Sequence, residues 1–413
     1  MFRPVPALLL LAATVATAPA LEISDNDTKF AFTFFSRAVA AKATATQAGG
    51  DSYNPVEGIN GGSDDMDLYM RWVRVGFKGT HKGYLYQVVL NANDLGRTST
   101  PTVAANISVW DAFVGKAFKG DGITQTVTFG KQNTWANTVV SRAGSQMLAT
   151  SRATGDYLNT NGVGLGYRLT APVISLGLDV QNSIGDDNAT QNIAATTAPN
   201  TSTGTNNRGE GMYYAARVEI TGPSEDAWAI GRWQESFAGK AGKGIALGFD
   251  AGASQRDRID GNSAVAGTQA ASQTVVVFGA DVLLHVDGLT ALAEYRHQAR
   301  KVDVDKGGDD SVGSEAFIVQ GGYAFSVDGF GVLEPAVRYQ KIDNDTADDN
   351  EGKSFGGKDY GDSGKQLDFG LNLYLAGHSN KFGLIYTTWT GEEGVGKDAA
   401  TADIVRLQHQ LMF

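Results

Sequence analysis

The segment from Gln366 to Leu375 alternates apolar and polar side chains almost without error. Its odd-numbered positions are all leucine or phenylalanine, whereas its even-numbered positions carry glutamine, aspartate, glycine, asparagine and tyrosine. A period of two residues is the period of a β-strand, whose successive side chains point to opposite faces. One face of this strand therefore suits lipid or an apolar core, and the other suits water.

The same alternation recurs about sixteen times along the chain, in segments of roughly 7 to 11 residues. This length is close to the roughly 9 to 11 residues that a tilted strand needs to cross a bilayer. Clear examples are 69–78, 84–91, 163–169, 174–181, 214–220, 245–250, 276–282, 289–300 and 402–413. We therefore predict an all-β fold, a sixteen-stranded antiparallel transmembrane β-barrel with an apolar outer surface and a wet interior.

The connections between these segments alternate in length. They are short near residues 80, 120, 171, 287, 329 and 379, and long near residues 55, 100, 145, 197, 263, 308, 353 and 395. Short periplasmic turns and long extracellular loops are typical of outer-membrane barrels, whereas a soluble β-sandwich needs no such asymmetry. Residues 226–237 fit either a seventeenth strand or a longer periplasmic connection, and we adopt the second interpretation because it keeps the long loops on one side.

The first twenty residues have the order of a secretory signal peptide. Arg3 precedes the apolar run 7–13, and Ala18-Pro19-Ala20 follows as an A-x-A cleavage site. The apolar run is shorter than the roughly 20 residues that a membrane-spanning helix needs. We therefore predict a signal peptide over residues 1–20 and an outer-membrane barrel over residues 21–413.

Composition excludes several other classes. Removal of Arg3 leaves 33 of the 34 Lys and Arg residues against 45 Asp and Glu residues, a net charge of −12, so nucleic acid is not expected as a partner. The chain has no cysteine and is therefore not a small disulfide-stapled module. Its 52 glycines and 9 prolines favour many strands and tight turns.

Charged residues concentrate on the face that the alternation turns inward. Seven arginines fall there: Arg74, Arg168, Arg217, Arg296, Arg300, Arg338 and Arg406. Seven acids share that face: Asp179, Glu219, Asp250, Asp281, Glu294, Glu334 and Asp368. Asp111 joins this pore-lining set only if a β-bulge turns it inward. The arginines would either bind anions along a passage or pair with the carboxylates to brace the wall, and the near-equal numbers do not decide between the two.

A segment without acidic residues runs from Asn133 to Gly155 and contains Arg142 and Arg152. If it folds into the lumen, these two arginines together with Lys131 would make a positively charged constriction. No metal site is predicted, because the five histidines show no ligand spacing and Asp343 and Asp345 lack the glycine spacing of a calcium loop. No cofactor is expected.

The last strand carries Val405, Leu407, Leu411 and Phe413 on one face, with His409 as the exception. Alternate apolar residues that end on an aromatic residue resemble the assembly signal of bacterial outer-membrane barrels. This similarity favours the outer membrane as the location.

Several segments resemble the phosphate-selective porin O/P family: Arg74-Val-Gly-Phe-Lys-Gly79, Asp111-Ala-Phe-Val-Gly115, residues 333–343 with Glu334, Arg338 and Tyr339, and residues 371–386. The resemblance implies a sixteen-stranded, trimeric outer-membrane channel with a ladder of lumen arginines and a third loop that folds inward. The chain departs from the family after its fifth strand, because Gly130-Lys131-Gln132-Asn133 is not followed by the Pro-Phe pair that the family tends to carry. A phosphate site is therefore not transferred residue by residue.

The sequence thus leads us to expect an outer-membrane porin for passive diffusion of small hydrophilic solutes, with anions such as phosphate as the favoured class. The expected partners are outer-membrane lipid, small solutes or inorganic anions, and two further copies in a homotrimer. Two alternatives stay open. One is a structural or adhesive barrel with a plugged lumen, and the other is a barrel enzyme with a histidine near a serine or aspartate at the long-loop end.

Overall fold

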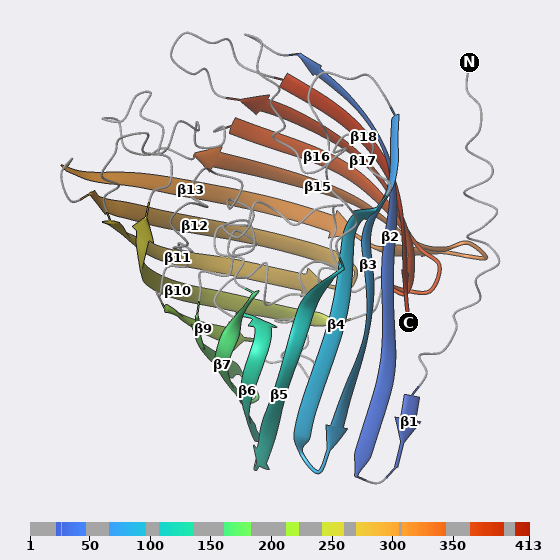
Figure 1. Ribbon diagram of the computed structural model, residues 1–413. Coiled ribbons are helices and arrows are strands. Elements are labelled where there is room, and N and C mark those ends of the chain that lie inside the picture. The colour runs from blue at the N-terminus through green and yellow to red at the C-terminus, as the bar shows by residue number, and fades with distance from the viewer. Residues whose placement is uncertain are drawn as a thin grey trace.

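One antiparallel sheet makes up the part of the chain that the computed structural model describes, which is residues 22–25, 27–46, 66–95, 107–134, 161–182, 212–222, 242–259, 270–304, 308–343, 364–391 and 401–413. Sixteen of its strands close into a barrel, and two strands of three residues each, β1 and β14, extend its rim (Figure 1). The predicted sixteen-stranded barrel is therefore confirmed. Residues 1–20, the predicted signal peptide, lie outside the described residues.

The strands follow one another around the barrel in chain order. Their bounds are β1 Glu22–Ser24, β2 Thr28–Thr46, β3 Met66–His81, β4 Tyr84–Leu95, β5 Ser108–Gly120, β6 Ile123–Asn133, β7 Asn161–Thr170, β8 Ile174–Gln181, β9 Tyr213–Thr221, β10 Lys243–Ile259, β11 Ala270–Val286, β12 Leu289–Val304, β13 Gly308–Tyr323, β14 Phe325–Val327, β15 Gly331–Asp343, β16 Gly364–Tyr374, β17 Asn380–Gly391 and β18 Thr401–Met412.

The barrel closes where the last strand pairs with β2. Register runs from Thr401 opposite Thr46 to Met412 opposite Phe35. Beyond it, the Phe34 amide donates to the Phe413 carbonyl (2.8 Å), the Phe413 amide donates to the Phe34 carbonyl (3.1 Å), and the two rings stack with centroids 5.0 Å apart. No open sheet edge is left along this seam.

The two faces of the wall are inverted relative to a soluble protein. In β10, Ile245, Leu247 and Phe249 are exposed on the outside while Asp250 is buried inside. In β16, Phe369 and Leu371 are exposed outward, whereas Gln366, Asp368 and Asn372 are buried inward, as the alternation predicts. Apolar side chains that would cost free energy in water face lipid, and hydrogen-bonding side chains face the interior.

Tight hairpins connect strands at the end of the barrel that has the short turns. Lys82 and Gly83 between β3 and β4 have φ values of 47° and 79°, and Asp287 and Gly288 between β11 and β12 have 42° and 93°. Positive φ at both central residues is the type I′ turn, whose twist matches the flanking strands. The ends of β2 and β18 that lead to the termini also lie at this end, because Thr28 pairs with His81 and Met412 with Phe35.

Two connections test the predicted loop pattern. β9 pairs directly with β10, with Thr221 opposite Ala246, so the described wall has no place for a strand between them. Residues 226–237 themselves lie outside the described residues. The long loop predicted near residue 308 is wrong, since Val304 of β12 already pairs with Gly308 of β13. These strands continue as a hydrogen-bonded ladder of 16 residues each, longer than a bilayer requires.

Candidate functional site

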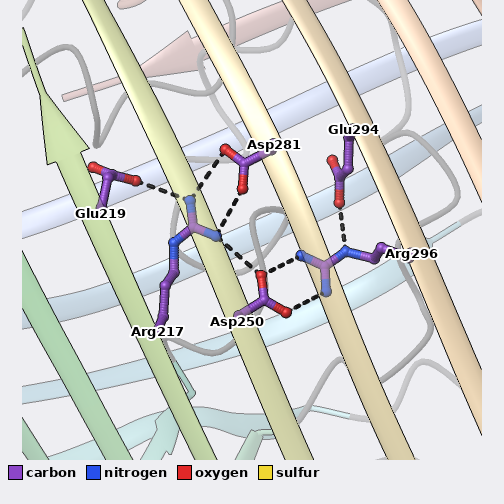
Figure 2. Close-up of polar contacts among 6 residues, drawn as sticks. All are labelled: Arg217, Glu219, Asp250, Asp281, Glu294 and Arg296. Carbon is purple, nitrogen blue, oxygen red and sulfur yellow. Dashed lines mark hydrogen bonds and ion pairs between the residues drawn. The ribbon is translucent and has the colours of Figure 1, made fainter.

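The inward face of β9 to β12 carries a network of two arginines and four carboxylates (Figure 2). Arg217 Nη1 lies 3.0 Å from Asp250 Oδ2 and 2.7 Å from Asp281 Oδ2, and its Nη2 lies 2.9 Å from Glu219 Oε2. Arg296 donates to both oxygens of Asp250 at 2.8 and 2.9 Å and, from Nε, to Glu294 at 2.5 Å. Asp250 therefore bridges the two guanidinium groups, and the network has a formal charge of −2.

Glycines on neighbouring strands make room for these guanidinium groups. A Cβ atom added to Gly248 would meet the guanidinium of Arg217, with Cζ at 2.6 Å, and one added to Gly279 would lie 3.0 Å from Cζ of Arg296. Gly279 stands between Asp250 and Arg296 in the register, since it pairs with both. The glycine-rich composition thus serves the inner wall as well as the turns.

Other inward arginines are also held by the wall. Arg168 Nη2 contacts Asp179 Oδ1 at 2.6 Å, and Arg338 Nε contacts Asp368 Oδ2 at 2.7 Å. Arg406 Nη1 donates to Thr387 Oγ1, which donates to Asp368 Oδ1. The Glu334 carboxylate accepts a hydrogen bond from the Tyr374 hydroxyl. All these side chains are buried, so for Arg168, Arg217, Arg296 and Arg338 the bracing alternative describes the geometry, and removal of one partner would leave an uncompensated buried charge.

A β-bulge turns Asp111 inward, the one condition under which the sequence places it in the lumen. Val89 pairs with Asp111 and Leu90 with Val109, so the ladder between β4 and β5 passes over Trp110. Asp111 is buried and accepts a hydrogen bond from Gln87 Nε2 at 2.8 Å. The bulge explains why strict alternation puts Asp111 on the wrong face.

The contacts of Arg74 include aromatic rings. Its Nε donates to Asn91 Oδ1 (3.0 Å), and its Cζ lies 4.1 Å from the ring centroid of Trp110 and 5.0 Å from that of Trp72. Arg37 of β2 lies beside it, with Cζ 4.5 Å from the Trp72 centroid. Arg74 is half-buried, whereas Arg37 is fully buried.

Four cationic or aromatic residues on the inner wall are not predicted from the sequence: Arg37, Arg71, Trp110 and Lys381. Arg37 lies in a strand where alanine and phenylalanine occupy both faces, so the alternation gives no signal there. Arg71 and Trp110 lie where the ladder shifts, between β2 and β3 and between β4 and β5. Lys381 lies near the start of β17, buried, with Nζ 5.1 Å from the Tyr374 ring.

The charges of the lumen divide between two halves of the barrel. We count only inward, buried or half-buried side chains within the described ranges, and include Arg71 because it lies over the Trp72 ring. The half made of β15 to β18 and β2 to β5 then carries Arg37, Arg71, Arg74, Arg338, Lys381 and Arg406 against Asp67, Asp111, Glu334 and Asp368, a sum of +2. The half from β6 to β13 carries Arg168, Arg217 and Arg296 against Asp179, Glu219, Asp250, Asp281 and Glu294, a sum of −2.

One of the three residues of the predicted constriction, Lys131, does not face the lumen. Lys131 pairs with Ala112 of β5 and Val163 of β7. It is two residues from the exposed Phe129 on the same strand, so its side chain lies on the outer face and does not line the lumen. Arg142 and Arg152 lie outside the described residues, and their role stays a prediction. Arg300 lies in β12 opposite Val275, but its side chain is also outside the described part.

Nothing in the described ranges forms a candidate metal site, since no three His, Cys, Asp or Glu side chains there could hold an ion. Within the same ranges, no helix has the length and apolar character to cross a membrane.

Comparison with known proteins agrees with this architecture. The model of the family described as "Phosphate-selective porin O and P" matches residues 47–413. None of the curated proteins compared is significantly similar in sequence.

Solved structures share the fold at low sequence identity. The anion-selective porin from Comamonas acidovorans is 12% identical with a TM-score of 0.50, over 93% of this chain and 100% of that one. The trimer form of in-vitro folded OmpT, an outer membrane protein from Vibrio cholerae, is 13% identical with a TM-score of 0.52, over 94% and 100%. The outer membrane channel DcaP of Acinetobacter baumannii is 11% identical with a TM-score of 0.51, over 94% and 99%.

Proposed function

Because the chain belongs to the phosphate-selective porin O and P family, we propose that its barrel is a passive diffusion channel for small hydrophilic solutes in the bacterial outer membrane. The observation that carries this function is the inverted wall, apolar where it meets lipid and lined with charged and amide side chains inside. A barrel of sixteen strands is wide enough to hold water. No reaction is needed for selective passage, because a polar wall and its charge pattern are sufficient.

We further propose that the channel favours anions, phosphate among them, and that the passage follows the positive half of the lumen. The likeness to an anion-selective porin of known structure is consistent with this proposal. Arg168, Arg217, Arg296 and Arg338 brace the wall with their carboxylate partners. The positive charge for an anion path then comes mainly from the half that contains Arg37, Arg71 and Arg74.

Planar-bilayer recording of the purified protein tests both parts. Steady ohmic steps are expected for a porin, and the reversal potential in a salt gradient is expected to have the sign of anion preference. Cation selectivity would contradict the second part and leave the first intact. A silent protein would favour the plugged barrel or the enzyme, and a hydrolase assay would then separate those two.

A homotrimer is the assembly that we propose, on the basis of the family and of the trimer form described for OmpT. Native mass spectrometry in detergent should give three times the mass of one chain. A monomer that conducts with the same step size would argue against any need for assembly.

A further inference from the structure

Four inward side chains form an arginine–tryptophan cluster, made of Arg37, Trp72, Arg74 and Trp110. The guanidinium groups and the rings alternate in space: Arg74 Cζ lies 4.1 Å from the Trp110 centroid and 5.0 Å from that of Trp72, and Arg37 Cζ lies 4.5 Å from Trp72 on the β2 side. These distances are within the roughly 6 Å of a cation–π contact. A guanidinium group that stacks by its face can still present N–H groups at its edge, and those are the groups that bind a carboxylate.

Irregular backbone contributes to the cluster. The ladder shifts beside Trp72, where Arg37 pairs with Trp72 but Ala38 pairs with Met70, and again beside Trp110. β-Bulges re-aim side chains and are frequent next to functional sites. Trp72 shares the face of Arg74 by ordinary alternation, and the shift between β4 and β5 brings the Trp110 ring against the same arginine.

The part of the cluster made by Arg74 and Trp110 is more accessible than the other arginine sites. Arg74 and Trp110 are half-buried, whereas Arg168, Arg217, Arg296, Arg338 and Arg406 are buried. Four of those five contact carboxylates directly. A solute in the lumen therefore reaches Arg74 and Trp110 more easily than those buried arginines.

The opposite wall supports an anion at this place. Seven wall strands lie between β3 and β11 in either direction around the barrel, so the cluster faces the carboxylate-rich network of β9 to β12. Arg74 is seven residues from the end of β3, and Arg296 is seven residues from the start of β12. Both of these strand ends lie at the short-turn rim, so the two arginines are at about the same distance from that rim. The formal charge of −2 on that network disfavours an anion beside β9 to β12.

We propose that the arginine–tryptophan cluster is a binding site for small organic anions that carry a flat aromatic ring, the arene carboxylates. The carboxylate binds the edge of the Arg74 guanidinium, and the ring packs against the Trp110 indole. Asp111, held by Gln87 beside Trp110, limits the site to one negative charge. This inference rests on the proposed channel function and adds a class of solute to it.

The test compares two carboxylates of equal charge and similar size, benzoate and cyclohexanecarboxylate, as blockers of chloride current through single channels in a planar bilayer. A stacking contact of about 1 kcal/mol predicts half-block by benzoate at about fivefold lower concentration. Trp110→Leu should abolish this preference, Trp110→Phe should keep it, and Arg74→Gln should weaken block by both compounds. Phe249→Leu, on the outer face, is the matched control and should change nothing.

Equal block by the two carboxylates in the wild-type channel, or a benzoate preference that survives in Trp110→Leu, would overturn the site while leaving the channel function in place. If Trp110→Leu gives no channel steps, Arg74→Gln decides instead, because unchanged block by both carboxylates in that variant would also overturn the site. Inorganic phosphate added to the same channels should show no dependence on Trp110. Absence of channel steps from the wild-type protein would overturn the channel function and this inference with it.

Discussion

Gly248 leaves open the space that the guanidinium group of Arg217 occupies. A Cβ atom at this position would lie 2.6 Å from Cζ of Arg217 and 2.5 Å from Asp281 Oδ2. The guanidinium cannot simply move aside, because buried Asp250, Asp281 and Glu219 hold it. The packing of the inner wall therefore depends on the absence of a Cβ atom at Gly248 as well as on the ion pairs of Arg217.

Gly248→Ala should consequently destabilise the barrel by about 1 to 3 kcal/mol, the usual cost of overpacking. Urea-dependent unfolding in lipid vesicles, read by gel mobility, measures this change. Gly120→Ala is the control, since a Cβ atom there meets nothing within 4 Å and the change should stay within about 0.5 kcal/mol. Equal stabilities of the two variants would show that Arg217 relaxes without cost.

Asp250 should matter more to stability than Glu219, although both belong to the same network. Asp250 accepts hydrogen bonds from both Arg217 and Arg296 and so links the two guanidinium groups, whereas Glu219 accepts a hydrogen bond from Arg217 at 2.9 Å. Asp250→Asn should cost about 3 kcal/mol, because it leaves two buried guanidinium groups with one poorer acceptor. Glu219→Gln also relieves repulsion in a network with excess acids and should cost less. Equal losses in the same unfolding assay would contradict the bridging role of Asp250.

The sequence alone predicts the barrel because lipid outside and water inside impose alternation over the length of a bilayer. Leu367, Asp368 and Phe369 can be assigned to their faces without coordinates for this reason. Alternation does not predict a strand where the strand extends beyond the bilayer, because lipid no longer requires an apolar outer face there. β12 and β13 continue beyond bilayer length, where charged residues such as Lys301 and Asp303 obscure the strand pattern, and a long loop is predicted instead.

The lumen site is only partly predictable. Arg217, Asp250 and Arg296 follow the alternation and are found on the inner wall, but their pairing depends on register between strands that are far apart in sequence. Asp111 and Trp110 depend on a bulge that no period reveals. Lys131 points outward because it alternates in phase with the exposed Val127 and Phe129 of its own strand, a signal that the sequence already contains, whereas proximity to an arginine-containing loop does not set its face.

The β3–β4 hairpin contains a residue that is poorly suited to its backbone. Lys82 has a φ of 47°, a left-handed conformation that asparagine adopts more readily than lysine. Lys82→Asn should therefore stabilise the barrel by about 0.5 to 1 kcal/mol. Asp287→Asn is the control, since aspartate already tolerates the equivalent position at a φ of 42° and little change is expected. A loss of stability in Lys82→Asn would mean that the lysine side chain makes a contact that outweighs backbone preference.

Phe413 has two separable roles, one in the folded seam and one predicted in assembly. In the seam its ring stacks on Phe34, while its backbone pairs with the same residue whatever the side chain. Phe413→Ala and Phe34→Leu should each lose the stacking and lower stability of the refolded barrel by about 1 kcal/mol. Only Phe413→Ala should also lower the amount of heat-resistant barrel recovered from the outer membrane, because only it alters the predicted assembly signal. Equal recovery of the two variants would reduce the role of Phe413 to the stacking contact with Phe34.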